Sequence, residues 1–173
     1  MLTQTTIKYV TGDATNPVAQ GKRIIAHCCN DAGFWNAGFV RALSERFHQP
    51  ERDYRRWARG LAPVPFRLGQ VQFVRVQPGL CVANIIGQSG IRSASNPNPL
   101  RYDSLREGLA RVRLLALEHD ASVHMPRIGA GHASGNWQII SAIIEEELCS
   151  HGINVTVYDL PEPDPRNLIL EVE

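Results

Sequence analysis

Short apolar runs recur along the chain and predict six β-strands. Residues 23–29 read RIIAHCC, a run between Gly21 and Asn30 that is typical of a strand buried on both faces. Pro78 and Gly79 separate two further runs, which predicts an antiparallel hairpin. The expected strands are residues 5–10, 23–29, 71–76, 80–86, 122–125 and 153–158.

Between these runs, apolar residues recur at intervals of three or four positions and predict four helices. The first begins near Gly38, and Pro50 suits the first turn of the second, which covers residues 51–59. Asp103 is the expected N-cap of the third. The apolar faces are Phe39, Leu43 and Phe47 in the first helix, Leu105, Leu109, Val112 and Ala116 in the third, and Trp137, Ile140, Ile144 and Leu148 in the fourth.

The order of these elements predicts an α/β fold with three layers. Strands alternate with helices around one hairpin, so we expect a mixed, largely parallel sheet with helices on both faces. No internal repeat or linker divides the chain, which indicates one domain over residues 1–160. Three prolines within residues 161–165 predict that a tail, residues 161–173, leaves the core.

Composition and charge narrow the class of protein. The 173 residues are 43% hydrophobic and 20% charged, as in a globular domain rather than a disordered chain. Eighteen basic and 17 acidic residues give a net charge of +1, which excludes a strongly basic nucleic-acid-binding chain. No apolar run is long enough for a membrane helix, and the N-terminus lacks the regions of a signal peptide. We therefore expect a cytoplasmic protein with no membrane partner.

Two clusters have a structural interpretation beside a functional one. Residues 41–59 contain six arginines, Arg41, Arg46, Arg52, Arg55, Arg56 and Arg59. They form either a phosphate-binding face or, because acidic residues lie among them, a solvated helix surface, which we favour. The four cysteines are Cys28, Cys29, Cys81 and Cys149. They lack the spacing of a disulfide framework or a zinc site, so we expect buried thiols and no metal.

Two loops rich in small residues carry the strongest candidate chemistry. Each follows a short strand and precedes a helix: residues 33–39 read GFWNAGF, and residues 127–135 read RIGAGHASG. Glycine lets main-chain N–H groups approach a ligand, and such groups ahead of a helix bind anions. Because open α/β sheets bind ligands at the carboxyl ends of their strands, the two loops predict a diphosphate site. Neither loop is a Walker motif or GxGxxG, and the alternative is that the glycines serve turns and helix packing.

The order of several short motifs resembles that of macrodomains, the modules that bind ADP-ribose. The motifs are GDAT at residues 12–15, HCCN at 27–30, NAG at 36–38, MPRIGAG at 125–131 and VTVYDL at 155–160. The resemblance spans residues 7–160 and is greatest to the terminal ADP-ribose glycohydrolases, which remove ADP-ribose from glutamate or aspartate side chains and deacetylate O-acetyl-ADP-ribose. It implies a three-layer α/β/α macrodomain fold, ADP-ribose and ADP-ribosylated proteins as partners, and no cofactor.

The resemblance also implies a role for each motif. Asp13 would accept a hydrogen bond from the adenine 6-amino group, with the main chain of Ala14 beside it. Tyr158 or Leu160 would flank the adenine, and Asn30 would contact the distal ribose. The diphosphate would lie between Trp35, Asn36, Ala37, Gly38 and Phe39 of the first loop and Ile128, Gly129, Ala130, Gly131 and His132 of the second. The structural alternatives are a turn residue for Asp13, a loop cap for Asn30 and a core side chain for Tyr158.

Two positions depart from the pattern of this group. Its best-known members use a lysine after the middle strand to attack the ribose and an aspartate in the second loop to transfer protons. Gln88 and Ala133 stand at these positions, and neither side chain can do that chemistry, although Gln88 could orient the ribose. Either catalysis is lost or water attacks the anomeric carbon directly. The candidates that would position this water are a diphosphate oxygen and the side chains of Asn30, Asp31, His132 and Ser134.

Three functions follow from the resemblance. The first, which we favour, is a mono-ADP-ribosylhydrolase that removes ADP-ribose from acidic side chains or cleaves related ADP-ribose esters. The second is a reader that binds ADP-ribose without cutting it. The third is a phosphatase acting on ADP-ribose 1″-phosphate. A structural or nucleic-acid adaptor fits poorly with the neutral charge and the two loops.

Overall fold

The apolar run at residues 23–29 forms all but the last residue of strand β2 (Arg23–Asn30), an inner strand of a six-stranded sheet. The computed structural model describes residues 3–162, and the strand order is β1-β6-β5-β2-β4-β3. The other strands are β1 (Lys8–Thr11), β3 (Val71–Gln77), β4 (Leu80–Gln88), β5 (Ser122–Met125) and β6 (Val155–Asp159). Only β3 and β4 pair antiparallel, so the predicted mixed, largely parallel sheet is confirmed.

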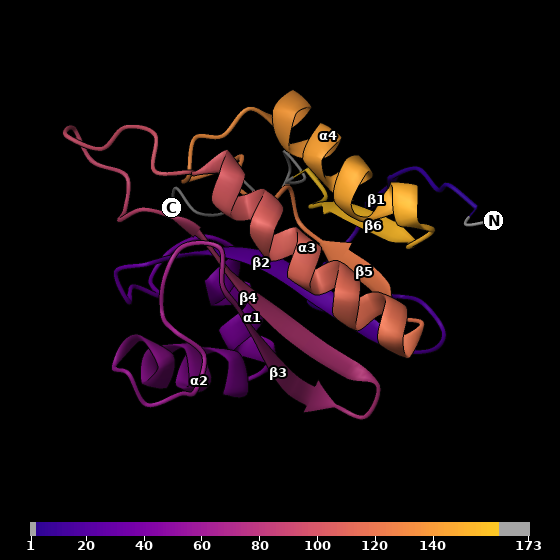
Figure 1. The fold of residues 1–173 in the computed structure, drawn as a ribbon, viewed down its shortest axis with the longest axis horizontal. Helices are drawn as coiled ribbons and strands as arrows, with labels where there is room; N and C mark the ends of the chain where they lie inside the picture. Colours follow the sequence, from indigo (N-terminus) through magenta and orange to yellow (C-terminus); the bar gives the residue numbers. More distant parts are fainter. Residues whose placement is uncertain (1–2, 163–173) are drawn as a thin grey trace, which may run out of the picture.

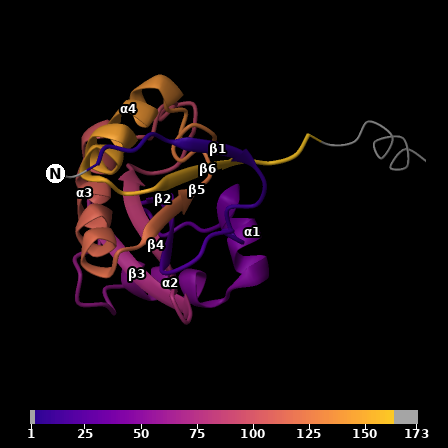
Figure 2. The same ribbon diagram turned by 90° about the vertical axis from the view of Figure 1, so that its right-hand side faces the viewer.

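Helices cover both faces of the sheet and complete the three predicted layers (Figures 1 and 2). One face carries α1 (Phe39–Arg46) and α2 (Gln49–Ala58), and the other carries α3 (Tyr102–His119), α4 (Trp137–Glu147) and the short 3-10 helix η1 (Cys149–His151). Consecutive residues of β2 point to opposite faces: Ile24 packs in the core under α3 and α4, and Ile25 packs with Tyr54 and Trp57 of α2.

Some predicted boundaries and burials differ from the structure. The third helix starts at Tyr102 with Arg101 at its N-cap, so the prediction that Asp103 is the N-cap is wrong. The Asp103 carboxylate lies in the first turn, where it still favours the helix dipole. Pro50 lies in the first turn of α2, as predicted. The four cysteines are free, but Cys28 and Cys81 are half-buried rather than buried. Most of the predicted tail, residues 163–173, lies outside the described residues.

At strand β2 the order in which strands are added to the sheet reverses. The chain reaches β4 on one side of β2 through α1, α2 and β3, and it reaches β5 on the other side through α3. Loops diverge from the carboxyl end of such a strand to opposite faces and leave a crevice between them. Within residues 3–162, no helix combines the length and hydropathy needed to cross a membrane.

Candidate functional site

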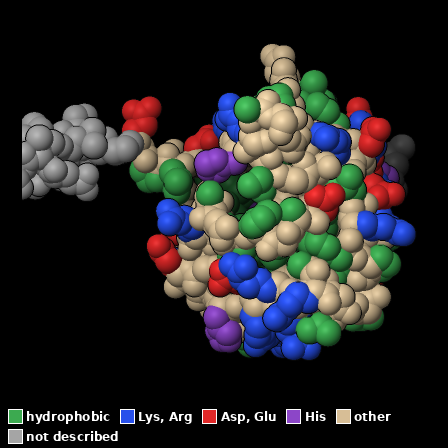
Figure 3. Space-filling model, turned by 90° about the vertical axis from the view of Figure 1, so that its left-hand side faces the viewer, with side chains coloured by type: hydrophobic (Ala, Val, Ile, Leu, Met, Phe, Trp, Pro, Cys, Tyr) green, Lys and Arg blue, Asp and Glu red, His purple; other side chains and the backbone are tan. Residues whose placement is uncertain are grey.

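Two adjoining cavities open at the carboxyl ends of the parallel strands and form one cleft. Their volumes are about 480 Å³ and about 240 Å³, and we call them the larger and the smaller cavity. Both are lined by Cys28, Ala37, Val40, Gln88 and His132, so the two cavities lie side by side. Figure 3 looks onto this face of the molecule, where hydrophobic side chains lie in a hollow.

The larger cavity gathers most of the residues that the sequence analysis assigned to ADP-ribose. The predicted residues that line it are Asp13, Ala14, Ala37, Gly38, Phe39, Gln88, Ile128, Gly129, Gly131, His132, Tyr158 and Leu160. They come from segments that follow five different strands. The sequence analysis gave no ligand-binding role to the other lining residues: His27, Cys28, Val40, Ala42, Pro126, Arg127 and Ala133.

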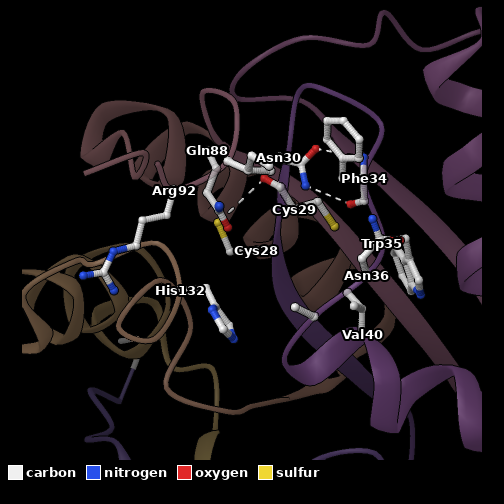
Figure 4. Close-up of a pocket in the computed structure, with 12 residues that line it drawn as sticks. Cys28, Cys29, Asn30, Phe34, Trp35, Asn36, Val40, Gln88, Arg92 and His132 are labelled. Atoms are coloured by element: carbon white, nitrogen blue, oxygen red, sulfur yellow. Dashed lines mark hydrogen bonds between the residues drawn. The ribbon is translucent and has the colours of Figure 1, made fainter. Parts of the chain in front are cut away.

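The smaller cavity is lined by loop residues around the end of β2 (Figure 4). The predicted residues here are Asn30, Trp35, Asn36, Ala37, Gln88 and His132. The lining also includes Cys28, Cys29, Phe34, Val40, Ile91 and Arg92. Of all the predicted site residues, Asp31, Ala130 and Ser134 lie outside the linings of both cavities. The roles given to the lining residues stay predictions.

The two glycine-rich loops meet across the cleft. Gly38 has a φ of 80°, and a Cβ atom added there would lie 3.1 Å from the imidazole of His132. Among the hydrogen bonds of residues 3–162, none has the amide of Gly131, His132 or Ala133 as its donor. The first turn of α1 begins directly after Gly38 and adds the free N–H groups of a helix N-terminus. The junction of the two loops is thus suited to an anion.

Leu100 supports the second loop from behind. This leucine is buried, and its amide donates a hydrogen bond to the main-chain oxygen of Ala133 at 3.3 Å. A Cβ atom on Gly129 would lie 3.0 Å from both methyl carbons of Leu100, and one on Gly135 would lie 2.6 Å from the main-chain oxygen of Gly129 and would collide with a methyl carbon of Leu100. Glycine is therefore required at position 135 by packing, whereas an added Cβ at Gly131 meets nothing within 4 Å.

The side chain of Asp13 stabilises a turn and also presents an exposed hydrogen-bond acceptor. The sequence analysis gave these two roles as alternatives. One carboxylate oxygen accepts hydrogen bonds from the amide and hydroxyl of Thr15 at 2.8 and 2.7 Å. The other lies 3.6 Å from the guanidinium of Arg46, and the side chain is 47% exposed. Burial raises the pKa of Asp13, but the Thr15 hydrogen bonds and Arg46 outweigh it and lower the pKa below its usual value. The carboxylate stays ionised and keeps an acceptor at the cavity edge.

Asn30 holds the first loop in shape, as its structural alternative predicts. Its side-chain NH2 donates to the main-chain oxygen of Phe34 at 2.8 Å, and its side-chain oxygen accepts from the amides of Ala32 and Phe34. The hydroxyl of Tyr54 donates to the same oxygen at 3.0 Å and to the main-chain oxygen of Asn30 at 2.7 Å. These bonds occupy the acceptor of Asn30, so its contribution to the cleft is the loop conformation and one remaining N–H.

Asp31 joins two loops rather than facing the cleft. Its carboxylate accepts a hydrogen bond from the amide of Gly90 at 2.7 Å, and its own amide donates to the main-chain oxygen of Gln88 at 2.9 Å. The prediction of Asp31 as a catalytic side chain therefore finds no support in its position. Its bonds connect the loop after β2 to the loop after β4.

The titratable side chains behind the cleft are neutral near pH 7. Burial lowers the pKa of His27 to about 4, although a hydrogen bond with Asn84 acts in the opposite direction. Burial raises the pKa of the Cys28 thiol to about 12. Tyr158 is buried, and its hydroxyl pairs with His124 at 2.8 Å, so this tyrosine is a core side chain that also borders the larger cavity. The cleft therefore has neither a thiolate nucleophile nor an imidazolium at His27.

Comparison with known proteins assigns the fold. The chain is similar to the structure of a macrodomain protein from Streptomyces coelicolor, with 48% identity and a TM-score of 0.79, over 88% of this chain and 98% of that one. This chain belongs to the macrodomain family. No family model matches it. Both the predicted family and the predicted fold class are confirmed.

Curated relatives of this macrodomain differ in size and in function. It is 34% identical over 163 residues to chromodomain-helicase-DNA-binding protein 1-like of Danio rerio, and this match covers 89% of the chain but 16% of that protein. It is 38% identical to ADP-ribose glycohydrolase OARD1 of Bos taurus, over 34% of the chain and 40% of that protein. It is 24% identical to ADP-ribose 1″-phosphate phosphatase of Lodderomyces elongisporus, over 89% of the chain and 99% of that protein. The chain thus spans about a sixth of the zebrafish relative.

The lining residues that the sequence analysis missed had weak signals. Ile91 and Arg92 follow the predicted strand of residues 80–86, in a segment to which the sequence analysis assigned no element. Arg127 belongs to the macrodomain motif MPRIGAG, but the sequence analysis gave ligand roles only to the residues that follow it in this motif. Its guanidinium pairs with both carboxylate oxygens of Asp159, at 2.7 and 3.0 Å, and lies within about 5 Å of the ring centres of Tyr9 and Trp137. A basic residue inside the motif was the signal that could have found it.

Asp13→Ala should weaken ADP-ribose binding by about 1–3 kcal/mol, because it removes an ionised hydrogen-bond acceptor. Asp13→Asn is the matched control for the turn: its amide oxygen can still accept from Thr15, but it leaves an NH2 group where the adenine amino group would donate. Isothermal titration calorimetry should show similar losses for both variants. Unchanged affinity in both would remove Asp13 from the ligand site.

Proposed function

We propose that this macrodomain binds ADP-ribose along the cleft and hydrolyses its linkage to acidic protein side chains or to related esters. The observation that carries the proposal is the contact between the two loops at Gly38 and His132, with free main-chain amides on one loop and a helix N-terminus on the other. The diphosphate would lie at this junction. The similarity to a relative named as an ADP-ribose glycohydrolase supports the activity.

The two cavities would divide the ligand between them. Adenosine would lie in the larger cavity, with its amino group at Asp13 and its ring beside Tyr158. The distal ribose would lie in the smaller cavity, near Gln88 and Trp35. Among residues 3–162, Asp13 is the only acidic residue in either lining, so little negative charge from this part of the chain opposes the diphosphate.

Direct attack by water is the chemistry that these residues allow. The water oxygen would form a bond to the anomeric carbon, while the bond from that carbon to the carboxylate of the modified side chain breaks. The carboxylate leaves as a stable anion, and the proton of the water passes to a diphosphate oxygen or to His132, which lines both cavities. Tight placement of the ribose supplies much of the rate enhancement, because it converts the attack into a step within one complex.

The reader function is the second candidate, because Gln88 and Ala133 replace the lysine and aspartate of the resembling group. One experiment separates the candidates. The macrodomain is incubated with a glutamate-ADP-ribosylated protein and, separately, with ADP-ribose 1″-phosphate, beside a calorimetric titration with ADP-ribose. Label release supports the hydrolase, binding without release supports the reader, and phosphate release alone supports the phosphatase. Absence of ADP-ribose binding would contradict all three.

Borohydride should trap no adduct between protein and sugar during turnover. Trapping requires an imine with a lysine, and the sequence has only Lys8 and Lys22. Lys8 lies in β1, Lys22 precedes β2 at the opposite end of the sheet, and neither lines the cleft. Mass spectrometry of the reduced reaction is the measurement. A covalent adduct on either lysine would overturn the direct attack by water.

A further inference from the structure

Arginine side chains of α2 lie beside the smaller cavity. Arg55 and Arg59 line a shallow hollow of about 370 Å³ together with Ala32 and Gly33 of the first loop. A Cβ atom on Gly33 would lie 3.3 Å from the Cβ of Ala58, so the loop packs directly on α2. Because Phe34 follows Gly33 and lines the smaller cavity, the arginines are next to its mouth. Figure 3 shows blue Lys and Arg side chains grouped below the hollow of the cleft.

Arg92 lies at the same mouth on another loop. It lines the smaller cavity with Ile91, and its side chain extends away from Cys28 at the cavity edge (Figure 4). The hydrogen bond between Asp31 and the amide of Gly90 fixes this loop against the loop after β2. The mouth is thus bordered by basic side chains from two separate elements.

These basic groups have little compensating charge. Arg55 forms an exposed pair with Glu51 at 3.4 Å, whereas Arg59 and Arg92 form no ion pair with any residue of the described range 3–162. Phe34 and Ile91 are each 48% exposed. Free guanidinium groups next to exposed apolar side chains are typical of a surface that binds a partner.

We propose that the surface formed by Phe34, Arg55, Arg59, Ile91 and Arg92 binds an acidic polypeptide segment around the modified side chain. This inference rests on the proposed function, since ADP-ribose in the cleft would lead its acceptor residue out through the smaller cavity. Guanidinium groups bind carboxylates in bidentate pairs, so glutamates and aspartates beside the modified residue fit this surface. A nucleic acid fits it less well, because single strands require several stacking rings, and the surface has one, Phe34.

The test uses a glutamate-rich peptide with ADP-ribose on one glutamate. We compare R55E/R59E and R92E with the control K22E/R75E, whose residues line a cavity at the opposite end of the sheet. R55E/R59E and the control change the net charge by the same amount. R55E/R59E should raise KM for the peptide roughly five- to tenfold, with kcat and the affinity for free ADP-ribose unchanged, and R92E should raise KM by a smaller factor. High salt should remove the difference.

Fluorescence anisotropy with the same labelled peptide keeps this test separate from the proposed function, since it measures binding without turnover. Weaker peptide binding in R55E/R59E than in K22E/R75E supports the surface even if no ADP-ribose is released. Equal losses in the two double variants would overturn it, because only net charge would then matter. A stronger loss with an ADP-ribosylated oligonucleotide than with the peptide would also overturn it and assign the surface to nucleic acid.

Discussion

Gly131→Glu is expected to abolish ADP-ribose binding while the protein stays folded. Gly131 lies in the second loop, lines the larger cavity and is exposed. An added Cβ meets nothing within 4 Å there, and the residue is not among the glycines with positive φ, so a side chain costs the fold little. The glutamate would occupy the space where the free amides lie and would place a negative charge against the diphosphate, which both sterics and Coulomb repulsion disfavour.

Gly131→Ala is the control that distinguishes the effect of the glutamate side chain from the effect of losing glycine. The alanine variant should keep affinity close to that of the wild type, since its methyl group projects into open space. Thermal unfolding of both variants should match the wild type, and calorimetry with ADP-ribose should distinguish them. Wild-type affinity in a folded Gly131→Glu protein would show that the diphosphate does not lie at this loop.

Asn30→Ala is expected to lower the hydrolysis rate about 10- to 100-fold, because small errors in placing the ribose have large effects on attack. The substitution leaves the amides of Ala32 and Phe34 without their acceptor and frees the main-chain oxygen of Phe34. Because three part-buried hydrogen bonds would be lost together, the loop that carries Trp35 would relax. A lower thermal midpoint should accompany the lower rate.

Tyr54→Phe is the control for this loop. The hydroxyl of Tyr54 donates to Asn30 from α2, but Tyr54 lines neither cavity. Its loss should reduce the rate less than Asn30→Ala does, because the side chain of Asn30 would still bind the loop amides. The release of ADP-ribose from a modified protein measures both variants. Full activity in Asn30→Ala would show that the distal ribose lies elsewhere.

The elements that the sequence predicted well are those with a strong local pattern. The apolar run at residues 23–29 predicted a strand buried on both faces, and it forms most of the inner strand β2. The hairpin followed from Pro78 and Gly79, and the structure places β3 and β4 on either side of them. The two glycine-rich loops were found for the same reason, since strand, loop and helix follow each other within a few residues.

The pattern of apolar and polar residues could not predict contacts between segments that are distant in the sequence. Arg92 borders the smaller cavity on a loop that Asp31, distant in sequence, holds through the amide of Gly90, and no periodicity in either loop predicts this bond. The sequence did not reveal this bond, and Asp31 was therefore a candidate for positioning the attacking water. Sequence also left Asn30 divided between loop cap and ligand contact, and only the four hydrogen bonds of its side chain show how much of it the loop uses.

The conformation of the second glycine-rich loop depends on Leu100, a residue outside the motif. The spacing of Gly129 and Gly135 matches a leucine that lies outside the motif, at the start of the segment leading into α3. A larger side chain at position 100 would collide with the loop, and a smaller one would leave a cavity beneath the glycines. Residues 127–135 transplanted into another scaffold would therefore lose their shape unless a residue equivalent to Leu100 went with them. Substitutions at positions 100, 129 and 135 therefore have to be made together.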